Sequence, residues 1–164
     1  MSTNILVIAN PFDNEQVGLL EAFEKSLGLE PHMTKKLRDI SASKTEAEYK
    51  NKIENAFDII LLLFNDGKIV DGCNIQGTRD IKTCNVFFAP ITQKSRPIIN
   101  LATDYALNGL NMEEIFVSIK STNKNMITNL ESRDFENLGE DDGYITYLKE
   151  KGDQQVQGNF IQIH

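Results

Sequence analysis

Residues 59 to 88 constrain the fold most, because three strand-like apolar runs follow one another there without a helix between them. The first run is IILLLF at 59–64, and the tight-turn residues Asn65-Asp66-Gly67 lead into a second at 69–75. A third run, Val86-Phe87-Phe88, ends before Pro90. Parallel neighbours would need crossover connections of about a dozen residues or more. These strands are therefore expected to pair as antiparallel hairpins.

Helix signals flank this hairpin unit on both sides. Asp13 and Gln16 have capping-box spacing, and Gly28 suits the left-handed residue that ends that helix. Ser43 and Glu46 predict a second helix, which we expect to run to residue 57. Pro97 suits a helical first turn, and Asn111 the left-handed residue after that helix. A strand at 5–8, a strand at 115–119, a helix at 123–130 and a hairpin of 135–138 with 144–148 complete the pattern.

These elements predict an α/β (α+β) fold with a mixed, mostly antiparallel sheet of six to seven strands flanked by about four helices. A length of 164 residues fits one domain. We expect that domain to have its core at about 3–150. The tail at 151–164 carries Val156, Phe160, Ile161 and Ile163. It is expected to add an edge strand, to pack on a second subunit in a homodimer, or to fray.

Composition excludes several classes of protein. Seventeen basic residues against 24 acidic ones give a net charge of −7 without a dense basic cluster, which argues against a nucleic-acid partner. The longest apolar run has far fewer than the roughly 20 residues that cross a bilayer, and the N-terminus does not resemble a signal peptide. A cytoplasmic protein without a membrane partner is expected. Two cysteines and two histidines are too few for a disulfide framework or a zinc cluster, so we expect no metal.

Three stretches give the chain a family resemblance. Residues 110–117 (LNMEEIFV) look like an "LGM-x-E-I" strand start with Asn in place of Gly. Asn123, Met126 and Asp134-Phe135 look like an N-x-x-A…G-F helix and strand, and Phe88-Ala89-Pro90 with Gln93 looks like V-x-P-x-x-[QR]. Together with the element order, these stretches resemble the GNAT superfamily of acyl-CoA-dependent N-acetyltransferases over residues 3 to 150.

The resemblance implies an enzyme that moves an acetyl group from acetyl-CoA to a small-molecule or peptide amine. It also implies the residues that contact acetyl-CoA, which are Phe88, Ala89, Ile91, Gln93, Lys94, Ser95, Arg96, Pro97, Ile98 and Asn123. The thioester carbonyl would be held by a backbone N–H near Phe88 to Ile91. The acidic balance of the chain would attract a cationic amine at long range.

Two motifs depart from the family pattern. The pyrophosphate loop [QR]-x-x-G-x-[GA] reads QKSRPI at 93–98, with Arg96 and Ile98 where the glycines would stand. Either the loop has lost coenzyme A, because Cβ atoms and Pro97 block the backbone, or Lys94 and Arg96 replace backbone donors with cationic side chains. The tyrosine that often protonates the departing thiolate is replaced by Leu130.

The sequence leaves the general base open. Asp71 and Asp80 lie nearest the central strands and are the candidates, with Glu113 and Glu114 at the start of a later strand. Two alternatives to the enzyme also remain. One is a catalytically inactive GNAT-fold binding or regulatory protein that has lost acetyl-CoA. The other is a flavodoxin-like fold opened by residues 5–13, which the consecutive strands after residue 59 oppose.

Overall fold

The computed structural model describes residues 3–51 and 54–152. Its strands are β1 (Asn4–Ile8), β2 (Ala56–Asn65), β3 (Lys68–Thr78), β4 (Thr83–Phe88), β5 (Glu114–Lys120), β6 (Glu136–Asp141) and β7 (Tyr144–Glu150). Its helices are α1 (Asn14–Ser26), α2 (His32–Ser43), α3 (Glu46–Asn51), α4 (Pro97–Asp104), the π-helical turn η1 (Tyr105–Gly109) and α5 (Lys124–Glu131).

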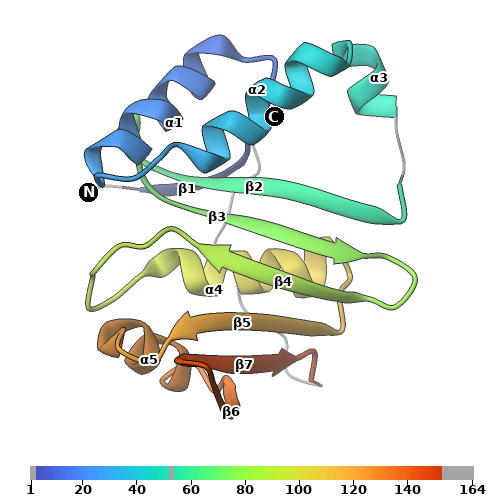
Figure 1. Ribbon diagram of the computed structural model, residues 1–164. Helices are drawn as coiled ribbons and strands as arrows, with labels where there is room; N and C mark the ends of the chain where they lie inside the picture. Colours follow the sequence, from blue (N-terminus) through green and yellow to red (C-terminus); the bar gives the residue numbers. More distant parts are fainter. Residues whose placement is uncertain (1–2, 52–53, 153–164) are drawn as a thin grey trace.

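The seven strands form one sheet in the order β1-β2-β3-β4-β5-β7-β6 (Figure 1). Every neighbouring pair is antiparallel except β4 and β5, which are parallel and joined through α4. The predicted mixed, mostly antiparallel sheet is therefore confirmed. The three consecutive strands of the hairpin unit lie side by side at its centre, as the turn residues indicated.

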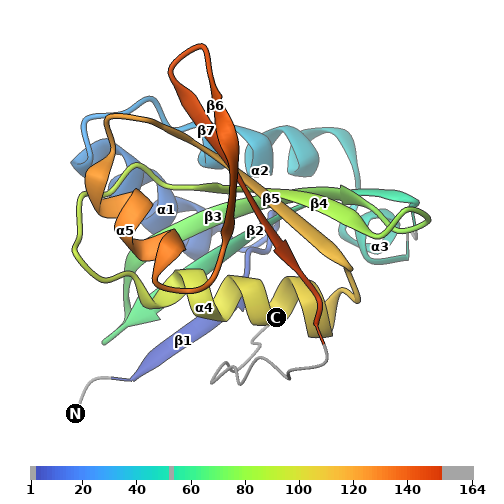
Figure 2. The ribbon, with the colours of Figure 1, turned by 90° about the horizontal axis from the view of Figure 1, so that it is seen from below.

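The helices divide between the two faces of the sheet (Figures 1 and 2). α1 and α2 cover one face through a small core, whose buried members are Ala9, Val17, Leu20, Leu37, Ile60, Leu62 and Ile69. α4 and α5 cover the other face, where a larger core includes Leu61, Leu63, Ile75, Val86 and Ile98. Successive residues of β2 alternate between the two cores, as the two-residue period of a strand requires.

Several helix ends follow the predicted signals. The Asp13 carboxylate accepts the amide of Gln16 at 3.1 Å, and the Gln16 side chain accepts the amide of Asn10. Gly28 has a φ of 73°, which glycine adopts without a Cβ penalty. Asn111 has a φ of 58° after η1, and Asn123 caps α5. The expected ends of these helices are confirmed.

The helix expected from Ser43 to residue 57 is shorter than predicted, because α3 covers Glu46–Asn51 and Ala56 already belongs to β2. A separate helix, α2, spans His32–Ser43 and was not predicted. Pro31 caps α2 without a side-chain hydrogen bond. The carboxylate of Glu24 supplies the cap instead, accepting the amides of Met33 and Thr34 at 3.0 and 2.8 Å. Because that cap comes from another helix, no local sequence signal marks the start of α2.

The C-terminal hairpin of β6 and β7 is also confirmed, with its turn at Asp142 and Gly143. β7 pairs with β5 along its whole length. The tail residues Val156, Phe160, Ile161 and Ile163 lie outside the described residues, so their expected role stays a prediction. Within the described ranges, every helix is too short or too polar to cross a membrane.

Candidate functional site

The site begins where β4 and β5 separate. Their parallel ladder has three residue pairs, from Thr83 with Glu114 to Asn85 with Phe116. Both strands continue beyond it, β4 to Phe88 and β5 to Lys120. Over these last residues the facing edges of β4 and β5 are therefore not paired with each other, and their backbone groups face the space between the two strands.

The amide of Phe88 is directed into this space. The next amide, that of Ala89, donates to the carbonyl of Gly72 in β3 at 3.0 Å. Successive amides of a strand point to opposite edges. The Phe88 N–H therefore faces β5, beyond the end of the ladder, where it can donate to an acceptor atom placed between the strands.

The loop after β4 runs to Arg96, which turns its side chain into the protein. Arg96 is only 1% exposed, and its Nε and Nη2 donate to Asp71 of β3 at 2.9 and 2.6 Å. Its guanidinium carbon also lies 5.6 Å from the centroid of the Phe88 ring. This fork-to-fork pair is the strongest geometry available to two charged side chains. Arg96 therefore ties the loop to the central sheet, and its Nη1 also donates to Met126 Sδ of α5 at 3.6 Å.

Asn129 of α5 ties the same loop from the other side. Its Oδ1 accepts the amide of Arg96 at 3.3 Å, and its Nδ2 donates to the carbonyl of Gln93 at 3.3 Å. Arg133 donates to Asn129 Oδ1 at 2.8 Å and to the carbonyl of Arg96 at 3.4 Å. Asn129 is 2% exposed. The backbone of the loop is thus fixed at both ends by buried side chains.

The outer part of the loop remains available. Gln93, Lys94, Ser95 and Pro97 are exposed, whereas Ile98 is buried. Within the described chain, no hydrogen bond engages the amides of Lys94 and Ser95. Because Arg96 and Ile98 turn inward, neither side chain fills the space in front of the N-terminus of α4. Pro97 lacks an N–H only at the first helical position, where helices leave that donor unpaired anyway.

A pocket of about 250 Å³ lies on the opposite face of the sheet, between the α1–α2 loop and the end of β4. Its lining consists of Glu24, Leu27, Leu29, Glu30, His32, Met33, Lys36, Asn74, Phe87, Phe88, Ala89 and Pro90. Phe88 and Ala89 belong both to this lining and to the separated end of β4. The pocket is therefore next to the space into which the Phe88 amide points.

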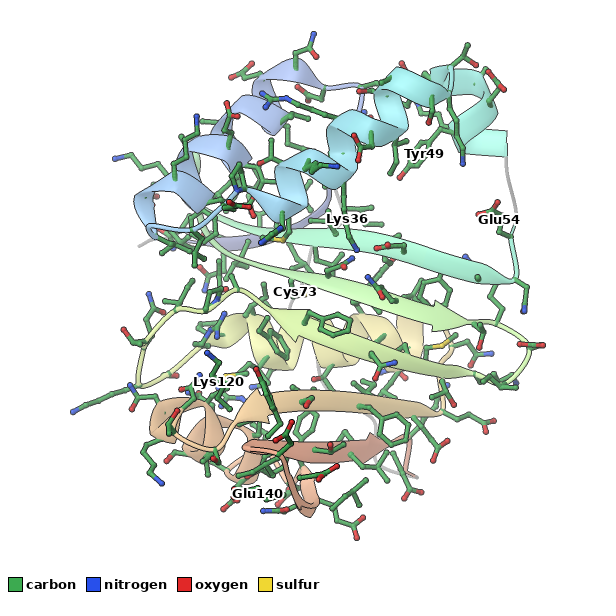
Figure 3. The ribbon with its side chains drawn as sticks, in the orientation of Figure 1. Lys36, Tyr49, Glu54, Cys73, Lys120 and Glu140 are labelled. Carbon is green, nitrogen blue, oxygen red and sulfur yellow. The ribbon has the colours of Figure 1, made fainter. Side chains whose placement is uncertain are left out.

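Polar side chains of α2, β2 and β3 form a closed network at the inner wall of the pocket. Lys36 reaches from α2 toward the sheet (Figure 3), and its Nζ donates to Asn74 at 2.7 Å and to Asp58 at 2.9 Å. Asn74 in turn donates to Asp58 and to the carbonyl of Ile59, and accepts from Gln76 at 2.9 Å. No local pattern in the sequence predicts this network, because its members are spread along the chain from Lys36 to Gln76.

The structure does not place any of the predicted bases at the pocket as a free carboxylate. Both carboxylate oxygens of Asp71 accept from Arg96, and Asp71 is 2% exposed. Asp80 lies in the β3–β4 turn, at the opposite end of β4 from Phe88. Glu113 and Glu114 lie at the same far end, next to Lys82 and Thr83. The structure brings none of these four carboxylates into the pocket.

The other predicted residues divide between the site and the core. Asn123 uses its side-chain oxygen to accept the amide of Met126 at 3.1 Å, and Leu130 is fully buried. Ile91 is half-buried in the loop and lies two residues after Ala89.

Two titratable side chains at the pocket were not predicted as functional there. Glu30 and His32 line it, both are exposed, and within the described chain neither side chain makes a hydrogen bond or an ion pair. The sequence presented His32 only as an isolated histidine, since α2 and the pocket it borders had no local signal. Among the described residues, no three His, Cys, Asp or Glu side chains come together as metal ligands.

No protein-family profile and no curated protein match this sequence. Solved structures do match it. Campylobacter jejuni N-acetyltransferase PseH in complex with acetyl coenzyme A is 16% identical with a TM-score of 0.60, covering 90% of this chain and 100% of that one. A GNAT-family acetyltransferase from Streptococcus pneumoniae is 15% identical with a TM-score of 0.61, covering 91% and 100%. Spermidine N-acetyltransferase from Vibrio cholerae is 11% identical with a TM-score of 0.61, covering 90% and 93%. The chain therefore has the GNAT fold, as its resemblance implied.

Proposed function

We propose that this protein is an acetyl-CoA-dependent N-acetyltransferase that acts on a small amine. One observation carries the proposal: the unpaired end of β4 directs the Phe88 amide between the strands, with a pocket directly beside it. The structural neighbours support the same class, since they include N-acetyltransferases and one of them was solved with acetyl coenzyme A.

The loop at 93–98 fits a pyrophosphate although it has no glycine. The exposed amides of Lys94 and Ser95 lie before the N-terminus of α4, an end of a helix that favours anions. The side chains of Arg96 and Ile98 point inward, so their Cβ atoms do not occupy the loop's outer face. Lys94 adds a cation at that surface. Of the two alternatives left open by the sequence, the geometry favours retained binding, through the backbone and Lys94 and without Arg96.

The bound thioester would supply the acetyl group. The chain would contribute the Phe88 N–H, aimed at the carbonyl oxygen, where charge develops during acyl transfer. The amine nitrogen would then bond to the acetyl carbon and lose a proton to solvent, the carbon–sulfur bond would break, and coenzyme A would leave as a thiolate. Leu130 offers no proton at the position of the usual tyrosine, so the thiolate takes its proton from water.

His32 is our candidate for the group that takes the proton from the incoming ammonium. It lines the pocket and its side chain has no partner within the described chain, whereas Asp71 is held by Arg96. Histidine is the side chain most often used as a general base. His32→Gln is expected to lower kcat about 10²-fold. Glu113→Gln is the control, since its side chain is 65% exposed beside Lys82 at the far end of β4.

The test of the proposal is a titration of the protein with acetyl-CoA and with S-acetylpantetheine, which lacks the pyrophosphate. We expect acetyl-CoA to bind at least tenfold more tightly, about 1.4 kcal/mol, because only it reaches the loop at 93–98. Release of free thiol in the presence of amines then measures turnover. No binding of acetyl-CoA at millimolar concentration would contradict the proposal and favour the inactive, binding-protein alternative.

A further inference from the structure

We infer that the acceptor is a monoamine whose amino group is carried on a small apolar body, such as an arylalkylamine. This inference rests on the proposed function, and it concerns the pocket between the α1–α2 loop and β4. The pocket walls carry the argument, because they differ from what a polyamine or a sugar would need.

Most of the wall is apolar. The side chains that contribute it are Leu27, Leu29, Met33, Phe87, Ala89 and Pro90, whereas the Phe88 ring packs on the other face of the sheet against Arg96. Two of them are unusually exposed for their type, Leu29 at 38% and Phe87 at 49%. Exposed apolar side chains that gather around one hollow commonly mark a binding site. An apolar group of the substrate would cover both.

The polar groups of the inner wall are already satisfied by the protein. The Glu24 carboxylate accepts from Met33 and from both the amide and the hydroxyl of Thr34. Lys36 donates to Asp58 and Asn74, and the Asn74 amide is itself fully used. Most of the hydrogen-bonding capacity of the inner wall is therefore already used within the protein.

This saturation selects against polar substrate bodies. A hydroxyl or ammonium placed against such a wall loses its water and regains few hydrogen bonds, which is unfavourable. Sites discriminate strongly when a polar group is left unpaired, so the expected preference is large.

The charged groups without partners lie at the rim. Glu30 and His32 are exposed, and within the described part of the chain their side chains are unengaged. One amino group can be accommodated there while the apolar body fills the interior. A volume of about 250 Å³ limits that body to about the size of one aromatic ring, since pockets for drug-sized ligands have roughly 300–1,000 Å³.

The experiment compares phenethylamine, spermidine and glucosamine as acceptors at saturating acetyl-CoA, with thiol release as the readout. We expect kcat/KM for phenethylamine to exceed both others at least tenfold. Leu29→Asn and Phe87→Asn should each raise KM for phenethylamine about five- to twentyfold, and leave KM for acetyl-CoA unchanged. Both residues are partly exposed, so the variants should fold.

Ile81→Asn is the matched control, because Ile81 is an apolar side chain exposed by 68% on the distant β3–β4 turn. It should leave both KM values unchanged. Faster acetylation of spermidine or glucosamine than of phenethylamine would overturn the inference while the proposed function stood. Absence of acetyl-CoA binding in the titration above would instead overturn both.

Discussion

The two faces of the sheet at its separated end are built from different chemistry. On the face of α4 and α5, a buried ion pair and a buried asparagine fix the β4–α4 loop from both sides. On the face of α1 and α2, the pocket walls are mostly apolar, and their polar groups bond sideways to one another. The side chains on the α4 and α5 face thus fix the backbone of the loop, whereas those on the α1 and α2 face form the walls of the pocket.

This difference explains how the loop keeps its outer amides uncovered although it contains no glycine. A glycine-rich loop lets the backbone approach a phosphate because it has no Cβ. Here Arg96 is turned away from the loop surface and anchored to Asp71, which keeps the outer amides uncovered by a different route. The loop face is therefore specified by long-range anchors, and the pocket face by the shape of its apolar walls. Four predictions test this division between the anchored loop and the apolar pocket.

The largest effect is expected at the anchor itself. Arg96→Met leaves the Asp71 carboxylate buried without its partner, which typically costs about 3–5 kcal/mol. Urea unfolding followed by circular dichroism measures that loss in the free energy of unfolding. The double variant Asp71→Leu/Arg96→Met should recover most of it, because an apolar pair of similar size removes the uncompensated charge.

The exposed pair of Arg38 and Glu21 is the matched control. Its side chains are 52% and 28% exposed, with a 2.6 Å contact. Arg38→Met should leave the free energy of unfolding nearly unchanged, because exposed ion pairs contribute little. If Arg96→Met cost no more than Arg38→Met, the ion pair would not be the anchor of the loop.

The second prediction tests whether the α4 face of the sheet excludes water. Cys73 and Cys84 are buried on this face. Burial raises the pKa of the Cys73 thiol well above its usual range and that of Cys84 to about 12. Unfolded thiols ionise near pH 8.5. The stabilisation that the two protonated thiols give the folded protein is therefore complete below that pH. It is lost as the pH rises toward the pKa values of the thiols in the folded protein.

Between pH 8 and pH 10 the two thiols should together lower the free energy of unfolding by about 4 kcal/mol. The measurement is urea unfolding at both pH values, for the natural protein and for Cys73→Ala/Cys84→Ala. The double variant should show a pH dependence smaller by that amount, whatever its stability at pH 8. Equal pH dependence of the two proteins would mean that this face admits water.

Asn129 tests the second anchor of the loop. Asn129→Leu removes the acceptor of the Arg96 amide and the donor to the Gln93 carbonyl. Leaving buried groups unpaired should cost about 1–3 kcal/mol, and the released loop should bind acetyl-CoA about tenfold more weakly. Asn108→Leu is the control, since Asn108 bonds to Asp104 at the other end of the helix. A loop fixed by Arg96 alone would leave acetyl-CoA affinity unchanged in Asn129→Leu.

The sequence predicted the sheet well because its signals are local. The turn at Asn65-Asp66-Gly67, the caps at Asp13 and Asn123, and the strand periods are all read within a few residues, and the structure confirms them. The start of α2 was missed because its cap is Glu24, which lies in α1. The first residues of β2 were assigned to a helix because Ala56 and Phe57 follow a charged segment of helical period.

The site was less predictable, because it depends on contacts between distant positions. The resemblance located the loop at 93–98, but Arg96 reads as a phosphate contact until its partner Asp71, 25 positions earlier, is known. The same contact turns Asp71 from a candidate base into an anchor. His32 became a candidate only once α2 placed it at the pocket. Side-chain direction, which decides these roles, is not encoded in spacing along the chain.

The smallest expected effect is that of Lys94→Ala, which distinguishes the roles of Lys94 and Arg96 in the loop. Lys94 is exposed, whereas Arg96 is buried, so only Lys94 is positioned to attract a phosphate. Lys94→Ala should leave the free energy of unfolding unchanged and weaken acetyl-CoA binding about two- to fourfold at low salt. At 1 M salt the difference should vanish, because the screening length falls to about 3 Å. Lys82→Ala, at the far end of β4, is the control and should change neither. A loss of affinity in Lys94→Ala that persists at 1 M salt would mean that Lys94 shapes the loop as Arg96 does, and the division between anchors and surface would fail there.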